Sequence, residues 1–192
     1  MIDYFFGSKS LITEKNLETN NIPIININDI KVNKQQIVAI TASGRYYNGT
    51  YNNEAVAVKI IDISKDETIL NEFIYWQEFK GDDSFLKFIG ASIYRSEAYL
   101  VFEFFAFTLE TALKNKILKR DKLPKIVKQI LNILHLMQKE KKMIRDFRPG
   151  VLGIAEGFKV KLHDFGKKII NIISVSILFI FKGNKFIILL PN

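Results

Sequence analysis

Four charged side chains of this sequence together offer the groups that phosphoryl transfer requires. Lys59 and Glu72 lie thirteen residues apart, Asp146 lies in the segment Ile-Arg-Asp-Phe-Arg-Pro, and Asp164 follows eighteen residues later in Asp-Phe-Gly. The reaction needs a cation on the phosphates, a carboxylate that holds this cation, a carboxylate that binds a metal ion, and a group that orients the attacking hydroxyl. The sequence has one candidate for each task.

Lys59 lies in a continuous apolar run, Ala55–Ile61, which is typical of a buried strand. A buried lysine is costly unless an opposite charge pairs with it. Glu72 is the natural partner, because it lies at the edge of the apolar stripe of a helix that the capping box Ser64–Glu67 opens. Glu72 can therefore face Lys59, whereas an ordinary surface glutamate would be the default interpretation without a match to a known motif order.

In this order, the segments resemble the signature set of protein kinases: the Lys of V-A-I-K, a helix Glu, H-R-D and D-F-G. The resemblance covers roughly residues 36 to 166, and the segment Tyr47–Tyr51 is similar to the tyrosine-kinase-like group and its pseudokinases. It implies ATP and Mg²⁺ as cofactors, and a protein substrate or protein partner.

The resemblance also implies a role for each site residue. Asp164 would coordinate the metal, and Ala57 would form a small ceiling over the adenine. The implied catalytic residues are Asp146 for the substrate hydroxyl, Arg148 for the transferred phosphate, Lys59 for the α- and β-phosphates, and Glu72 to hold Lys59. The implied nucleotide-binding residues are Gly44, Ala57, Lys59, Phe102 as gatekeeper, and the backbone around Glu103 and Phe105.

Several positions depart from the kinase pattern. The glycine-rich loop aligns with Ala39–Gly44, so that only its third glycine, Gly44, is present. Val151 stands where an asparagine would hold the second magnesium ion, and Ile144 replaces the histidine before Arg145. Gly153 falls where kinases place an apolar residue beneath the adenine. These departures predict weak or absent catalysis.

The hydrophobic pattern predicts five strands with one helix and then further helices, an order that resembles the small lobe of a protein kinase followed by the start of its large lobe. The resemblance implies an α+β, protein-kinase-like fold, with a five-stranded antiparallel small lobe, one helix, and an incomplete helical large lobe. The expected boundaries are an N-terminal extension over 1–35, the small lobe and hinge over 36–105, a partial large lobe over 106–166, and an atypical apolar tail over 167–192. Strands are expected over 36–40, 46–51, 55–61, 88–94 and 98–104, and helices after Ser64, over Leu109–Lys119 and from Pro124.

The tail departs most strongly from a kinase, since no activation segment, A-P-E turn or substrate-binding helices follow Gly166. Its apolar stretch before Lys182 has about thirteen residues, short of the roughly 20 that a membrane span needs. The tail is predicted to form a β-hairpin that turns at Gly183-Asn184.

The amino-acid composition excludes several kinds of site. With 192 residues, 48% hydrophobic, the chain can build a packed core, and with no cysteine it has no disulfide, thiolate metal site or thiol nucleophile. Its two histidines, His135 and His163, are too few for a metal site, and each is predicted to be a structural or half-exposed residue. The N-terminus lacks the pattern of a signal peptide, so a cytoplasmic location is expected.

The net charge of +8 is concentrated in residues 114–148, which hold twelve Lys or Arg and three acidic residues. Such a segment could be a polyanion-binding face or the solvated side of a helix together with arginines of a catalytic loop. The second interpretation is favoured, because no aromatic residues interleave the lysines of Lys114–Lys128, as single-strand binding would require. No nucleic-acid partner is expected.

Three functions are compatible with these features. The chain is an ATP-dependent protein kinase with impaired transfer of the γ-phosphate to a protein hydroxyl, a pseudokinase that binds a partner without catalysis, or a non-functional truncated kinase fragment. In the third case, the exposed apolar faces of the helix Ile126–Met137 and of the tail would make the protein poorly soluble.

Overall fold

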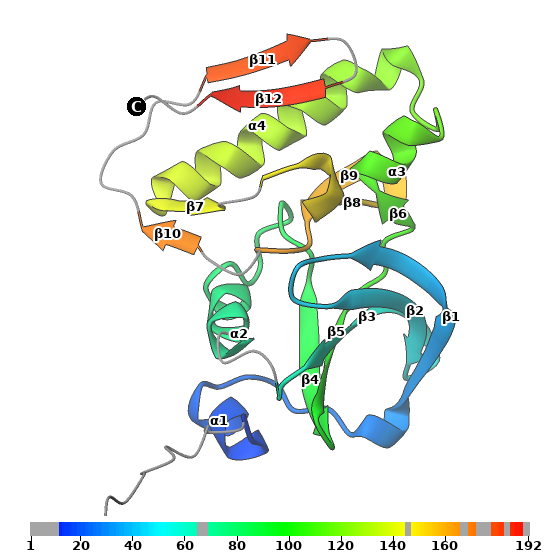
Figure 1. The fold of residues 1–192 in the computed structure, drawn as a ribbon, viewed down its shortest axis with the longest axis vertical. Helices are drawn as coiled ribbons and strands as arrows, with labels where there is room; N and C mark the ends of the chain where they lie inside the picture. Colours follow the sequence, from blue (N-terminus) through cyan, green and yellow to red (C-terminus); the bar gives the residue numbers. More distant parts are fainter. Residues whose placement is uncertain are drawn as a thin grey trace, which may run out of the picture.

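A five-stranded antiparallel sheet is the largest sheet in the computed structural model, which describes residues 12–64, 69–144, 147–165, 169–171, 178–182 and 185–189 (Figure 1). The spatial order of its strands is β1-β2-β3-β5-β4. This sheet confirms the predicted small lobe. Its strands are β1 (Ile30–Ile40), β2 (Arg45–Tyr51), β3 (Glu54–Asp62), β4 (Phe88–Tyr94) and β5 (Glu97–Glu103).

Two tight turns of the sheet contain residues in the left-handed conformation. Asn52 (φ 50°) and Asn53 (φ 65°) connect β2 to β3, and Arg95 (φ 56°) connects β4 to β5. Two-residue hairpin turns of the primed types need positive φ, and asparagine tolerates it better than other residues with a side chain. These turns fix the register of β2 against β3, where Tyr46 faces Lys59, and that of β4 against β5.

The sheet begins earlier than the sequence indicated. β1 starts at Ile30 instead of residue 36, after a short helix α1 (Glu14–Thr19) and a 3-10 turn η1 (Ile27–Asp29). Leu17 of α1 is completely buried, and Ile24 forms a parallel bridge with Ala91 of β4. Single apolar residues at irregular spacing make these contacts, so no period of 2 or 3.6 reveals them.

The two faces of the sheet pack against different clusters. Val56 and Val58 of β3 point into a small cluster that also contains Ile30, whereas Ala57 and Ile61 point into the main core. The helix α2 (Ile69–Glu78) contributes Phe73 and Trp76 to that main core. Residues 65–68, which include most of the predicted capping box, lie outside the described residues.

The second part of the chain contains helices and a small sheet. The helices are α3 (Leu109–Lys114) and α4 (Leu123–Lys139), and the sheet has the order β6-β8-β9. The helix α3 ends five residues before the predicted Lys119, because Lys116 adopts φ 54° and cannot continue it. The remaining elements are β6 (Phe107–Thr108), β8 (Leu152–Ala155), β9 (Lys159–Leu162) and the 3-10 turns η2 (Arg120–Lys122), η3 (Pro149–Val151) and η4 (Glu156–Phe158).

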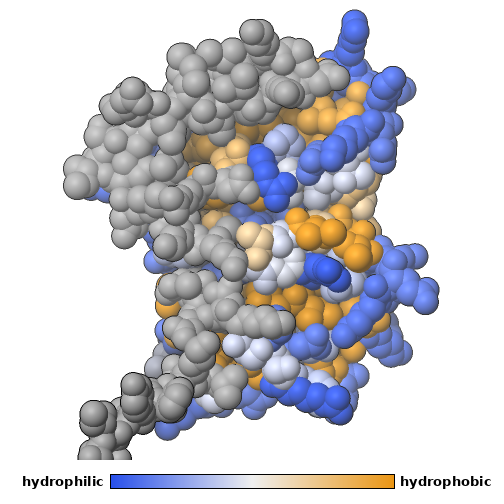
Figure 2. All heavy atoms as spheres, viewed as in Figure 1, coloured by the Kyte–Doolittle hydropathy of each residue, from blue (hydrophilic) through white to orange (hydrophobic). Residues whose placement is uncertain are grey.

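The long helix α4 agrees with its predicted pattern. Pro124 lies in its first turn, and the buried side chains recur at three- and four-residue spacing. They are Ile126, Ile130, Ile133 and Met137. Hydrophilic residues cover the outer edge that α3 and the start of α4 form (Figure 2), so the basic segment is solvated there.

Two further pairs of strands lie near the C-terminal end of the chain. β10 (Ile169–Asn171) pairs with β7 (Lys142–Ile144), which the sequence did not predict. β11 (Leu178–Lys182) and β12 (Lys185–Leu189) form the predicted hairpin, whose turn residues lie outside the described residues. No helix in the described part of the chain combines the length and apolar character that crossing a membrane requires.

Phe165 connects α2 to the second part of the chain. It is completely buried, and its ring centroid lies 4.5 Å from that of Trp76 and 5.5 Å from that of Phe79 on and after α2. It also contacts Phe85 at 6.0 Å and Tyr75 at 6.0 Å. Such pairs add to the stability that burial of the ring area already gives.

We predict that Phe165→Ala lowers the free energy of unfolding by about 3–5 kcal/mol, because it leaves a cavity between packed rings. The matched control is Phe104→Ala, since Phe104 is 41% exposed. It should change stability by less than about 0.5 kcal/mol. Urea unfolding measures both, and equal effects of the two substitutions would contradict the packing described for Phe165.

Candidate active site

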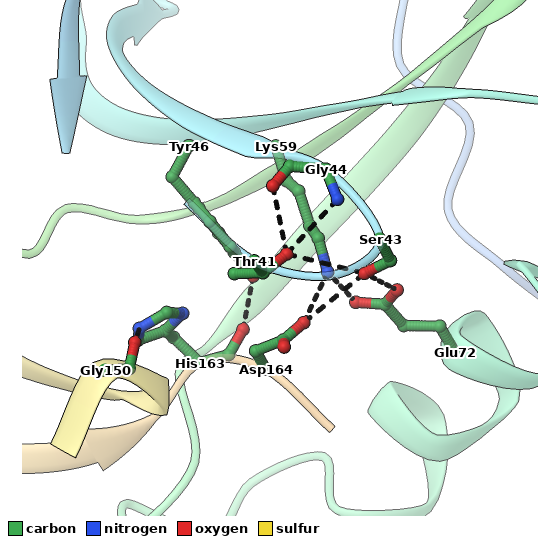
Figure 3. A network of polar contacts seen from close by, with 9 residues as sticks. All are labelled: Thr41, Ser43, Gly44, Tyr46, Lys59, Glu72, Gly150, His163 and Asp164. Atoms are coloured by element: carbon green, nitrogen blue, oxygen red, sulfur yellow. Dashed lines mark hydrogen bonds and ion pairs between the residues drawn. The ribbon is translucent and has the colours of Figure 1, made fainter. Parts of the chain in front are cut away.

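A buried lysine between two carboxylates forms the centre of the site (Figure 3). Lys59 Nζ donates to a carboxylate oxygen of Glu72, and it lies 2.7 Å from Oδ1 of Asp164. The side chains of Lys59, Glu72 and Asp164 are 0%, 5% and 3% exposed. The expected Lys59–Glu72 ion pair is therefore present, and Asp164 joins it from the far end of the sequence.

The three residues meet because the strand, helix or segment that carries each of them directs its side chain to the same place. Lys59 shares the face of β3 that carries Ala57 and Ile61 into the main core, where an unpaired ammonium would be costly. Glu72 precedes the buried Phe73 on α2, which turns the carboxylate toward the sheet. Asp164 lies two residues after the end of β9 and precedes Phe165, whose burial fixes the backbone there.

The charges within this cluster shift the pKa values of its members. Burial lowers the pKa of Lys59, but Asp164 and Glu72 raise it by more, so the pKa lies above its ordinary value. Burial, together with the Asp164 charge, raises the pKa of Glu72 despite the nearby ammonium. One cation thus faces two carboxylates, and the cluster retains a net negative charge that a further cation could neutralise.

The loop between β1 and β2 lies over this cluster. Ser43 Oγ lies 3.2 Å from Oε2 of Glu72, to which it donates, and 3.5 Å from Oδ1 of Asp164. The loop is closed by Thr41, whose Oγ1 donates to the carbonyl of Gly44 at 3.0 Å. A Cβ on Gly44 would lie 2.5 Å from the carbonyl oxygen of Ile60, so this glycine permits close packing against β3.

Beside the ion-pair cluster lies a group of four buried rings, which we call the aromatic cluster: Tyr46, Phe102, Phe105 and His163. All four side chains are completely buried. The ring centroid of Tyr46 lies 5.7 Å from that of Phe102, 5.6 Å from that of Phe105 and 5.0 Å from that of His163. The Tyr46 hydroxyl donates to the carbonyl oxygen of His163.

The structure gathers the predicted nucleotide-binding residues at this same place. Ala57 is completely buried opposite Phe102. Phe105 stacks on His163 with a centroid distance of 4.9 Å, and a Cβ on Gly153 would lie only 2.9 Å from its ring. The ring of Phe105 thus occupies the space that a side chain at position 153 would take.

Glu103 is fixed through its side chain and its backbone. Its Oε1 accepts from Lys161 Nζ at 2.7 Å and from the backbone amide of Lys87 at 2.7 Å. Its own amide donates to the Lys87 carbonyl at 2.9 Å. Although burial lowers the pKa of Lys161, its bonds to Asp83 and Glu103 raise it by more.

The predicted catalytic residues of the loop after β7 are only partly described. Asp146 lies outside the described residues, as does Arg145. Arg148 is 40% exposed and places Nη1 at 3.6 Å from Oε2 of Glu110 on α3, so one of its interactions is with the helical part of the chain. Val151 is buried, and its apolar side chain offers no oxygen to a metal ion.

Three residues near this centre were absent from the site that the sequence predicted: Ser43, Tyr46 and His163. The sequence placed Tyr46 two positions after Gly44 on a strand, and a strand residue is buried or exposed according to its face. A period of two within a strand rich in tyrosine does not reveal which face is which. In this structure, contacts with residues distant in the sequence decide which face of β2 is buried.

His163 is completely buried, and its lowered pKa keeps the imidazole neutral near pH 7. Its Nε2 lies 3.0 Å from the carbonyl oxygen of Gly150, so Nε2 carries the proton and Nδ1 is a buried acceptor without a partner among the described residues. Burial, with a smaller contribution from Lys59, lowers the pKa of His163 to about 4, against the raising effect of Asp164.

This shift predicts a pH dependence of stability. The folded pKa lies below the unfolded value of about 6.5, so the unfolded state binds the proton first and stability falls as the pH decreases from 6.5 toward 4. Between pH 7 and pH 4.5, the wild-type protein should lose about 2 kcal/mol more than His163→Gln, which retains a donor for Gly150. Denaturant unfolding at both pH values measures this, and parallel losses in the two proteins would refute it.

Comparison with known proteins and protein families shows to which family the chain belongs. A search among curated proteins finds no match. A family model described as "Protein kinase domain" matches residues 34–171, which include the five-stranded sheet except for the start of β1, α2, both helices of the second part and the Asp164 segment. Since the match spans more than half of the chain, this protein belongs to the protein kinase domain family.

Proposed function

We propose that the domain is a catalytically impaired protein kinase of the tyrosine-kinase-like group, which binds ATP with Mg²⁺ and transfers the γ-phosphate slowly to a protein hydroxyl. The observation that supports it most directly is the buried cluster of Lys59, Glu72 and Asp164. A polar cluster in this position is costly for a purely structural role, and it matches the needs of phosphate binding. The absence of cysteine agrees with the reducing cytoplasm.

The charges of the site fit the phosphate end of the ligand. Lys59 would contact the α- and β-phosphates while Glu72 holds its ammonium in place, and Asp164 would ligand the metal ion that supplies charge neutralisation during transfer. The negative charge left in the cluster suits a divalent cation. Asp146 and Arg148 are proposed to orient the substrate hydroxyl and the transferred group.

The same site predicts a low rate. The side chain at position 151 cannot hold a second magnesium ion, which removes part of the charge stabilisation that dominates phosphoryl transfer. The hydroxyl of Ser43 is already bonded to Glu72, so the loop gives fewer free donors to the phosphates. Both effects lower the rate more than they lower the affinity for a nucleotide.

A pseudokinase that binds a protein partner without catalysis is the second candidate, and the aromatic cluster favours it. In the proposed ATP site, the adenine would lie between Ala57 and position 153, and the rings of Tyr46 and Phe105 are buried there. The purine end of ATP therefore does not fit this conformation. The two candidates differ in whether these rings can move aside.

The first experiment measures the thermal midpoint with and without several millimolar MgATP. Binding at 100 times the dissociation constant raises stability by about 2.7 kcal/mol, and a weaker site gives a smaller rise. We predict a rise for the wild-type protein that Lys59→Met abolishes and Lys128→Met retains, because Lys128 is exposed on α4.

Lys59→Met leaves two buried carboxylates without a cation, so Glu72→Gln serves as a second variant with less charge imbalance. It should weaken the MgATP-dependent rise by disturbing the position of Lys59. A cooperatively unfolding wild-type protein with no rise at saturating MgATP would refute ATP binding and leave the partner-binding module.

A further inference from the structure

The four rings of the aromatic cluster leave too little space for a further planar ring between them. The centroid distances that involve Tyr46 are 5.0, 5.6 and 5.7 Å, and Phe105 lies 4.9 Å from His163. A ring stacked between two others needs about 7 Å between its neighbours, because carbon atoms in contact stay about 3.5 Å apart. A purine can therefore enter only if at least one ring leaves.

Tyr46 is the ring with the strongest reason to be the one that moves. It lies on β2, two residues after Gly44 of the loop that lies over the ion-pair cluster, and it pairs with Ala39 of β1 next to a register shift. Its hydroxyl makes one hydrogen bond, to the carbonyl oxygen of His163. Its ring also lies 5.4 Å from Lys59 Nζ, beside the place proposed for the phosphates.

The hydrogen bond of Tyr46 ends on the residue directly before Asp164. It thereby joins the five-stranded sheet to the segment that carries the proposed metal ligand, as the close view shows (Figure 3). Burial keeps the pKa of the Tyr46 phenol above its ordinary value, with Glu72 and Asp164 adding to the shift, so the hydroxyl remains a donor. The contact is thus independent of pH in the neutral range.

We infer that Tyr46 is the specificity-determining residue of the site: its ring excludes a purine, and its hydroxyl holds the Asp164 segment against the sheet in the closed form. The inference rests on the proposed function, because that function places the adenine between Ala57 and Gly153. Nucleotide binding then requires the ring to leave, so the measured affinity is reduced by the small fraction of open molecules.

Calorimetry with adenosine and with MgATP tests this inference on the full chain. The variant Tyr46→Val removes the ring and retains a strand-forming residue, and the matched control Tyr51→Val makes the same change on the same strand against the small cluster. We predict that Tyr46→Val binds adenosine at least about tenfold more tightly than the wild-type protein, and that Tyr51→Val does not.

Tyr46→Phe separates the effect of the ring from the effect of the hydroxyl. It retains the ring and removes the hydroxyl, so it should bind adenosine less tightly than Tyr46→Val. If Tyr46→Val does not unfold cooperatively, Tyr46→Leu replaces it, because it also removes the ring and leaves a smaller void. The same tenfold gain in adenosine affinity is then expected.

The two ligands distinguish the inference from the proposed function. Tight adenosine binding by Tyr46→Val without any MgATP binding would support the inference and refute the ATP site. Equal adenosine affinity in the wild-type protein and Tyr46→Val would overturn the inference and leave the proposed function intact. Folded variants that bind neither ligand would overturn both, since Tyr46 would then not be what excludes the purine.

Discussion

The buried ammonium of Lys59 is the constraint on which the rest of the structure depends. An unpaired charge without access to water is too costly to keep, so the fold has to bring carboxylates to it. The contact of Glu72 with Lys59 fixes the position of α2 against the sheet. The contact of Asp164 with Lys59 fixes the segment after β9 against the same sheet. Ser43 completes the same network from the loop. One side chain thereby sets the relative placement of three elements that are far apart in the sequence.

The aromatic cluster lies next to this network, and it stabilises the structure by packing of rings instead of by charge. Tyr46 excludes water from one side of Lys59, which strengthens the interactions of Lys59 with the carboxylates. Ionic contacts and ring packing thus support the same closed arrangement. The buried ion pair and the packed rings are therefore compatible, because the rings keep water away from the charges.

The residues that the sequence could place are those whose position follows from a local rule. The apolar run around Lys59 and the three- and four-residue spacing in α4 predicted their elements, and the resemblance predicted that Lys59 and Glu72 meet. The early start of β1 and the burial of Tyr46 were not predictable, because contacts with distant strands decide them. The roles of the site residues remain predictions, and Asp146 lies outside the described part of the chain.

The contact between Gly153 and Phe105 limits how this chain could change. A methyl group at position 153 would meet the buried ring at 2.9 Å, and the neighbouring atoms of Phe105 lie too close for a small adjustment. A smaller residue at position 105 alone would leave a void above the glycine. Each substitution is thus unfavourable without the other. The two positions are therefore coupled, and a larger residue at 153 combined with a smaller residue at 105 should cost less stability than the sum of the two single substitutions.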